Sequence, residues 1–160
     1  MINLPDYKKI HCIGIGGIGL SAVAEILMAR GYDISGSDMR ESDMTAKLAH
    51  DGAQIYIGHK AENVDGKDLI IYSSAISMEN PELAKAKELG IPAVTRAQAL
   101  GALMAEYDSS IAISGTHGKT TTTSMVSLIL KNAHKEPTIL VGGNLPEING
   151  NVYVGQNDYF

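Results

Sequence analysis

Two glycine-rich segments are the places where this chain could bind phosphate. The first one reads Gly14-Ile15-Gly16-Gly17-Ile18-Gly19. It fits the pattern G-x-G-x-x-G, in which glycines permit a tight turn and let the backbone approach a diphosphate. A helix that begins at such a turn offers free N–H groups and the positive end of its dipole to the negative charge. The pattern predicts a diphosphate site, and on its own it fits NAD, FAD or a UDP-sugar.

An acidic residue at a suitable distance supports this interpretation. Asp38 lies 19 residues after Gly19, at the end of the second expected strand. From that position a carboxylate can bond a ribose hydroxyl. The structural alternative stays open: the glycines would only let helix and strand pack closely, and Asp38 would be a solvated loop acid.

The second segment is similar to a Walker A loop. It reads Ser114-Gly115-Thr116-His117-Gly118-Lys119-Thr120. In such a loop the backbone N–H groups cradle ATP phosphates, Lys119 would reach the β- and γ-phosphates, and the Thr120 hydroxyl would bind Mg²⁺. The general pattern G-x-x-x-x-G-K-S/T differs at one position, because it requires glycine where this chain has Ile113. The structural alternative is a glycine-rich turn that caps a helix.

The elements that must position these loops alternate between strand and helix. Strands are expected at 8–15, 33–37, 54–57, 69–73 and 92–95. Helices are expected at 18–30, 43–50, from Pro81 to Gly90 with Asn80 as its cap, and at 96–107. This alternation predicts an α/β fold, a Rossmann-like parallel sheet with flanking helices.

The pattern starts afresh near residue 108, so we expect two domains, 1–107 and 108–160. The second would begin with a strand at 111–113, followed by the second loop, a helix from Lys119 to about Asn132 and a strand at 138–141. It would be the start of a P-loop ATPase domain. Only about 50 residues follow the boundary, which is short for an independent α/β domain. We therefore expect the chain to be the front part of a longer protein.

Composition excludes several classes of protein. The 160 residues include 13 basic and 18 acidic side chains, a net charge of −5, which argues against non-specific nucleic-acid binding. An apolar fraction of 44% can form a core. The single cysteine excludes a disulfide framework and a cysteine-cluster zinc site. The sequence has no apolar run of membrane-spanning length and no signal-peptide pattern at its start, so a cytoplasmic protein without a membrane partner is expected.

Two phosphate loops in one chain narrow the choice of function. A dehydrogenase has no use for the second loop, and most P-loop NTPases lack the first. The combination favours an ATP-dependent ligase that acts on a UDP-sugar. The alternatives are an NAD-dependent oxidoreductase, which leaves the second loop unexplained, and a non-catalytic module that binds a UDP-sugar.

The motifs resemble those of the Mur ligase family. Residues 115–122 are similar to that family's G-T-x-G-K-T-T-T, which also lacks the first Walker glycine. Further similar segments are Ser73-Ser74-Ala75-Ile76, Thr95-Arg96-Ala97 and Gly142-Gly143-Asn144-Leu145. The resemblance spans essentially the whole chain, and the motifs fall in the family's order.

The resemblance implies a three-domain cytoplasmic enzyme of peptidoglycan precursor synthesis. It would use ATP and Mg²⁺ to join L-alanine to the lactyl carboxylate of UDP-N-acetylmuramate through an acyl phosphate. A related ligase that adds a peptide to the same sugar is the alternative. This chain would hold the UDP-sugar domain and the opening of the ATP domain. By itself we expect it to bind the UDP-sugar, to be inactive, and to be open to self-association through its incomplete second domain.

The resemblance also implies the site residues. The UDP-sugar would be bound by Ile15, Gly16, Gly17 and Ile18 around the diphosphate, Ser37 and Asp38 at the uridine, and His59, Ser74 and Arg96. ATP would be bound by Gly115, Thr116, His117, Gly118, Lys119, Thr120 and Thr121. Lys119 and Thr120 would carry the catalysis, and Thr120 would ligate Mg²⁺. His59 as a surface histidine and Arg96 as a solvated arginine remain open, and His11 and Cys12 are expected to pack in the core.

Overall fold

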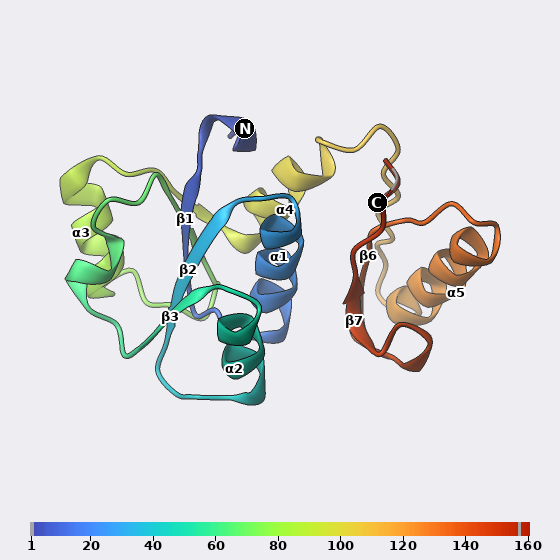
Figure 1. The fold of residues 1–160 in the computed structure, drawn as a ribbon, viewed down its shortest axis with the longest axis horizontal. Helices are drawn as coiled ribbons and strands as arrows, with labels where there is room; N and C mark the ends of the chain where they lie inside the picture. The colour runs from blue at the N-terminus through green and yellow to red at the C-terminus, as the bar shows by residue number, and fades with distance from the viewer. Residues whose placement is uncertain (1, 157) are drawn as a thin grey trace. The chain divides into compact units, whose positions relative to one another are not determined.

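The computed structural model describes residues 2–156 and 158–160 of the chain, and Figure 1 shows its course. The chain forms two compact units, one up to Ala102 and one from Leu103 to Phe160, called here unit 1 and unit 2. Each has its own sheet and its own apolar cluster.

Unit 1 contains a parallel sheet. Within the described residues its strands are β1 (Lys9–Ile13), β2 (Asp33–Asp38), β3 (Gln54–Ile57), β4 (Leu69–Tyr72) and β5 (Ala93–Thr95). They lie in the order β3-β2-β1-β4-β5, and every neighbouring pair is parallel. The predicted Rossmann-like α/β fold is confirmed. The chain moves outward from β1 in two directions, so the strand order reverses between β1 and β4, where such sheets bind ligands at their carboxyl ends.

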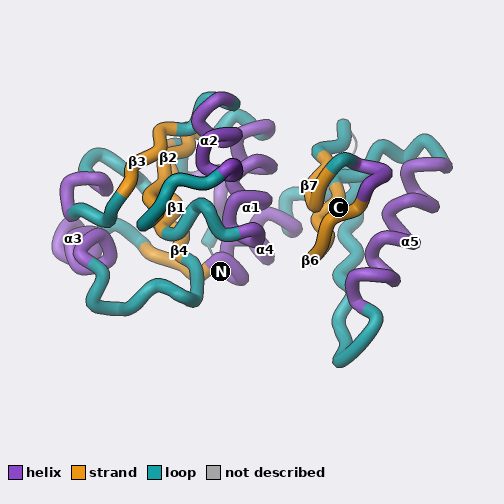
Figure 2. The backbone as a smooth tube through the Cα atoms, turned by 90° about the horizontal axis from the view of Figure 1, so that it is seen from below, coloured by secondary structure: helices purple, strands orange, loops and turns teal. Residues whose placement is uncertain are grey.

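Helices cover both faces of this sheet. Figures 1 and 2 show α1 (Ile18–Ala29), α2 (Asp43–His50) and α4 (Arg96–Met104) on one face and α3 (Pro81–Leu89) on the other. The short 3₁₀ segment η2 (Ala61–Val64) accompanies α3, and another, η1 (Leu4–Asp6), precedes β1.

Local sequence explains where α2 and α3 begin and end. Ser42 and Thr45 form a reciprocal capping box at the start of α2. Asn80 accepts the Glu82 N–H at the start of α3, as predicted, with proline at the first helical position. Gly90 ends α3 at a φ of +70°, a left-handed conformation that favours glycine.

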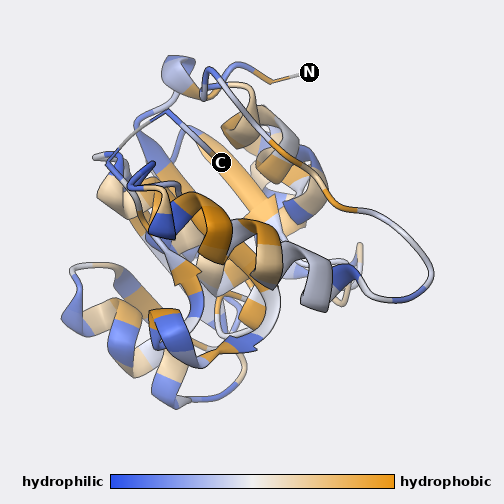
Figure 3. Ribbon diagram, turned by 90° about the vertical axis from the view of Figure 1, so that its right-hand side faces the viewer, coloured by the Kyte–Doolittle hydropathy of each residue, from blue (hydrophilic) through white to orange (hydrophobic). Residues whose placement is uncertain are grey.

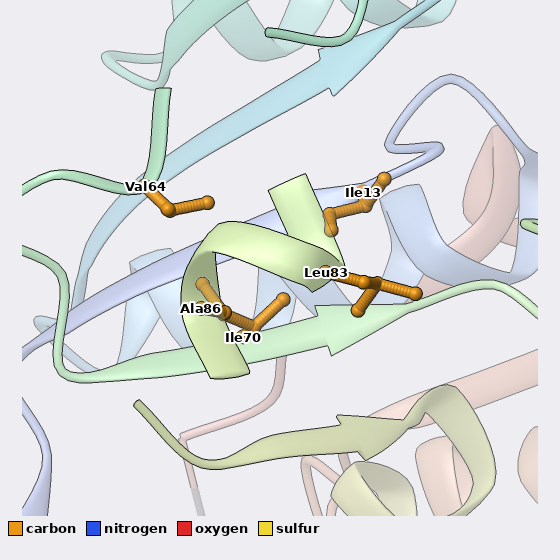
Figure 4. Packing of buried hydrophobic residues seen from close by; sticks show 5 residues of the cluster. All are labelled: Ile13, Val64, Ile70, Leu83 and Ala86. Atoms are coloured by element: carbon orange, nitrogen blue, oxygen red, sulfur yellow. The ribbon is translucent and has the colours of Figure 1, made fainter. Parts of the chain in front are cut away.

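The central strands are apolar because both faces of the sheet are covered. On the α3 face, Ile13, Ile70 and Val64 pack against Leu83 and Ala86 of α3 (Figure 4). His11 and Cys12 are fully buried, which confirms that they pack in the core. Burial raises the pKa of the Cys12 thiol to about 12, so this group stays protonated at neutral pH.

Unit 2 is built from one helix and a two-stranded sheet within the described residues. The helix α5 (Lys119–Asn132) is polar in its first turns and apolar in its later ones (Figure 3). The antiparallel strands are β6 (Ile139–Leu145) and β7 (Gly150–Tyr153), with the 3₁₀ segment η3 (Pro146–Ile148) between them. Ile139, Val141, Leu145 and Ile148 form its apolar cluster.

The strand predicted at 111–113 is wrong. Ser109 makes a single parallel bridge to Tyr159, and the Ile111 N–H donates to the Phe160 carbonyl at 2.8 Å. No further ladder forms along 111–113 among the described residues. An apolar run with strand character becomes a strand only where a second segment pairs with it, which local sequence does not specify.

Candidate functional site

The carboxyl edge of the unit 1 sheet gathers the predicted UDP-sugar residues. The glycine loop follows β1, Asp38 ends β2, His59 follows β3, Ser74 follows β4 and Arg96 follows β5. Parallel strands end at a common edge, so residues far apart in sequence share one region of unit 1. Ile18 is 64% exposed and Ser74 is exposed at this edge.

The glycine loop is held by the backbone of β2. Both Gly14 and Ile15 donate their N–H groups to the Ser37 carbonyl, at 2.8 and 3.1 Å. Gly14 has a φ of +81°, which favours glycine. The Ile15 side chain is fully buried against Gly36, where an added Cβ would lie 2.5 Å from Ile15 Cδ1. Ile15 therefore anchors the loop, and its side chain is not available to a ligand.

Asp38 also braces this loop. Its Oδ2 accepts the Gly16 N–H at 2.9 Å, and a Cβ on Gly16 would lie 2.9 Å from the same oxygen. Glycine is required there because a side chain would collide with the carboxylate. The ribose contact expected of Asp38 stays a prediction, and the structure adds a loop-bracing role.

The first turn of α1 has features that favour negative charge. Gly17 is the N-cap and has no side chain that could cap the helix, so no side-chain oxygen offsets the positive end of the helix dipole. The side chain of Arg96 packs at Gly19, where an added Cβ would lie 3.2 Å from Arg96 Nε. A cation therefore lies beside a helix N-terminus that already attracts negative charge.

A buried polar network lies behind this edge, and sequence analysis missed its centre, Glu82. The side chain of Glu82 is 0% exposed. Its Oε2 accepts the Ser37 hydroxyl at 2.6 Å and lies 3.1 Å from His59 Nδ1. Its Oε1 accepts the Asn63 amide at 2.6 Å and lies 3.5 Å from His11 Nε2. His11 Nδ1 in turn lies 2.9 Å from the hydroxyl of Ser35 on β2.

These contacts keep Glu82 ionised although it is buried. Burial alone raises the pKa of a carboxyl group, but the nearby His11 ring and hydrogen bonds from Ser37 and Asn63 outweigh burial and lower the pKa of Glu82 to about 2. The network therefore has a carboxylate at its centre throughout the neutral range.

Sequence analysis predicted two members of this network, Ser37 and His59, as site residues but did not predict their shared partner Glu82. The Ser37 side chain is fully buried, and its hydroxyl donates to Glu82. The contact expected between Ser37 and uridine stays a prediction. His59 lies between this network and the sheet edge with 11% of its side chain exposed. Glu82 could have been found from its spacing, because it lies four residues before Ala86 and shares the buried face of α3.

The predicted ATP residues form a loop in unit 2. Gly115 and Gly118 have φ values of +156° and +76°, and Gly118 is the N-cap of α5 without a side-chain cap. Lys119 Nζ donates to the carbonyls of Gly115 at 2.6 Å and Thr116 at 3.3 Å. The lysine ammonium thus lies against the loop backbone, while Thr121 continues the first turn of α5 and His117 lies exposed in the loop.

The surroundings of Thr120 leave space for a phosphate and supply one of the oxygen ligands that a hard metal ion needs. An added Cβ on Gly142 would lie 3.7 Å from Thr120 Oγ1, and one on Gly143 would lie 3.4 Å from Thr120 Cγ2. The backbone of β6 therefore lies beside the Thr120 side chain with no side chain between them. In residues 2–156 and 158–160, no group of three His, Cys, Asp or Glu side chains could hold a metal. Thr120 would supply one oxygen, and Mg²⁺ typically takes its others from phosphates and water.

The structure is an α/β protein with two glycine-rich loops, one on each unit and each followed by a helix. A family model described as "Mur ligase family, catalytic domain" matches residues 9–108. The chain belongs to the Mur ligase family.

Curated relatives extend the match over nearly the whole chain. It is 54% identical over 153 residues to the UDP-N-acetylmuramate–L-alanine ligase of Alkaliphilus metalliredigens and 60% identical to that of Clostridium botulinum. Both matches cover 96% of this chain and 33% of the relative. The chain therefore spans about a third of the length of these curated relatives.

Solved structures agree with these matches. The UDP-N-acetylmuramate–alanine ligase of Thermotoga maritima superposes with a TM-score of 0.85 at 38% identity, over 94% of this chain and 36% of that one. A Neisseria UDP-N-acetylmuramate:L-alanyl-gamma-D-glutamyl-meso-diaminopimelate ligase superposes with a TM-score of 0.86 at 27% identity, over 96% and 51%. Every helix in the described part of the chain is too short or too polar to cross a membrane.

Proposed function

We propose that this chain is part of an enzyme that joins L-alanine to the lactyl carboxylate of UDP-N-acetylmuramate with hydrolysis of ATP. The observation that carries the proposal is the presence of two different phosphate loops on two units of one chain. The name shared by relatives that are 54% and 60% identical supports the choice of L-alanine. The activity would serve peptidoglycan synthesis in the cytoplasm, where both nucleotides are available.

Unit 1 would bind the UDP-sugar. The glycine loop with Ile15, Gly16, Gly17 and Ile18 and the dipole at the N-terminus of α1 would bind the diphosphate, with the Arg96 cation beside them. Asp38 and His59 follow the next two strands and would meet the nucleoside. Ser37 would act from behind, through its bond to Glu82.

Unit 2 would bind ATP. The lactyl carboxylate oxygen attacks the γ-phosphorus, and ADP leaves. The resulting acyl phosphate is attacked by the alanine amine, which loses a proton, and inorganic phosphate leaves as the amide forms. Lys119 would leave the Gly115 carbonyl and donate to the β- and γ-phosphates, which lowers the repulsion between two anions. Mg²⁺ bound at Thr120 would neutralise further charge on these phosphates.

The 160 residues alone are proposed to bind substrate without turnover. The curated relatives are about three times as long, so most of their residues have no counterpart here. The neighbouring reaction is a second candidate, because the peptide-adding relative superposes as well as the alanine-adding one. Sequence identity favours L-alanine, at 38% against 27% in the two solved structures.

Phosphate release by the full-length enzyme tests this proposal. We expect release that requires ATP, UDP-N-acetylmuramate and L-alanine together. A tripeptide in place of L-alanine should give at most a few per cent of that rate. Faster release with the tripeptide would favour the second candidate, and release without any UDP-sugar would contradict both.

A further inference from the structure

His59 has one nitrogen inside the Glu82 network and one outside it. Its Nδ1 lies 3.0 Å from Ser37 Oγ and 3.1 Å from Glu82 Oε2. Among the described residues Nε2 has no hydrogen-bond partner, and this nitrogen is not buried. The side chain is 11% exposed, so Nε2 is the nitrogen that a ligand could reach.

The network determines which nitrogen carries the proton. Glu82 is ionised and can only accept, and the single Ser37 hydroxyl proton points to it over 2.6 Å. His59 Nδ1 therefore faces a lone pair of Ser37 Oγ and one of Glu82 Oε2, so it must carry the proton and donate it to them. In a neutral imidazole the other nitrogen is then a bare acceptor. His11, the other histidine at Glu82, is 0% exposed and can play no such outward role.

The order of the strands places His59 near the base of a bound nucleotide. In a doubly wound sheet the diphosphate lies at the loop after β1 and the ribose lies at the acid that ends β2. A nucleotide that continues in the same direction reaches β3, the next strand in the sheet. Gly58, just before His59, donates its N–H to the Asp38 carbonyl at 2.8 Å, so the two strand ends are adjacent.

We propose that Glu82 is a positioning residue that holds His59 in its Nδ1–H form, so that Nε2 accepts a hydrogen bond from the imide N–H of uracil. Cytosine has a bare ring nitrogen at that position, and two acceptors would face each other. Glu82 would thus set the choice of pyrimidine without touching the ligand. The inference rests on the proposed function, which makes the ligand a uridine nucleotide.

Nitrogen-15 NMR of histidine-labelled chain tests the first half without any ligand. At about pH 8, above the ordinary histidine pKa, we expect His59 to show a protonated Nδ1 and an unprotonated Nε2. Glu82→Gln should give a mixture of both forms, because an amide can donate as well as accept. Glu88→Gln is the matched control on the same helix, since the side chain of Glu88 is 69% exposed and pairs with Lys85 at the surface. A proton on Nε2 in the parent chain would overturn the proposal.

Titration with UDP and with its N3-methyl derivative tests the second half. Methylation removes the imide proton, so we expect about tenfold weaker binding to the parent chain and to Glu88→Gln. In Glu82→Gln, the ratio of the Kd of the N3-methyl derivative to that of UDP should fall to about two or three. Equal binding of both ligands to the parent chain would overturn the proposal even if Glu82→Gln does not fold. Failure to bind UDP at all would refute the proposed function and the hydrogen bond between uracil and His59. The NMR result would still decide whether Glu82 sets the tautomer of His59.

Discussion

The two phosphate loops differ in how firmly their own unit holds them. In unit 1, two backbone N–H groups bond Ser37 and a third bonds the Asp38 carboxylate, so the loop is fixed before any ligand arrives. In unit 2, Lys119 donates to the Gly115 carbonyl, and the loop is exposed. Binding to the first loop would need little rearrangement, whereas binding to the second would have to move Lys119 off the Gly115 carbonyl.

The units around the loops also differ. Unit 1 has a five-stranded sheet with helices on both faces, whereas unit 2 has a two-stranded sheet and the helix α5 among the described residues. A two-stranded sheet packed on one helix forms a small core. We therefore expect unit 2 to be less stable than unit 1, and its loop to be less firmly fixed.

The largest expected effect separates the roles of the two loops in the full-length enzyme. Lys119→Ala should lower the ligation rate at least ~100-fold, because the charge on the transferring phosphoryl group loses its cation. Binding of UDP-N-acetylmuramate, measured by calorimetry, should change less than twofold. Activity within a few-fold of the parent would contradict the role of Lys119.

Gly17→Ala is the corresponding change in unit 1. Its Cβ would lie 3.4 Å from the Gly14 carbonyl, an ordinary contact, so the fold should tolerate it. We expect about tenfold weaker UDP-sugar binding, because a methyl group blocks close approach of the diphosphate. Gly101→Ala on α4, where nothing lies within 4 Å, is the control. Undiminished affinity in Gly17→Ala would show that the loop only shapes the fold.

Hydrogen exchange should show the difference between the units directly. We expect amides of β1, β2 and β4 to exchange at least ~100-fold more slowly than those of β6 and β7, because the open forms of a small unit are more populated. Mass spectrometry of the 160-residue chain at several concentrations checks this and also detects self-association. Equal protection in a proven monomer would contradict the weaker second unit.

Acid should weaken unit 1 through Glu82. The carboxyl group has an ordinary pKa of 4.5 and a pKa of about 2 in the folded chain, so its contribution is complete above about pH 4.5 and is lost as the pH falls towards 2. The contribution is on the order of 3 kcal/mol. Urea unfolding of the parent and of Glu82→Gln should therefore give a stability difference that shrinks across this window. Glu88→Gln should show no such trend, and a constant difference for Glu82→Gln would contradict the assignment.

Much of the fold could be predicted because its signals are local. The bounds of α2, β3 and α5 follow from caps and apolar periodicity, and Asn80, Pro81 and Gly90 mark α3 by their own backbone chemistry. The strand predicted at 111–113 fails because pairing depends on a distant segment. The glycine loop and Asp38 could be recognised from spacing alone. Glu82 could not be assigned a role, because its partners come from β1, β2, η2 and the segment between β3 and η2.

Calorimetry of the 160-residue chain tests the central claim most directly. The claim is that unit 1 is a preformed site for a UDP-sugar, although its glycine pattern is shared with NAD-binding proteins. UDP-N-acetylmuramate should bind at least ~10-fold more tightly than NAD in parallel titrations. Equal or tighter binding of NAD would contradict the account.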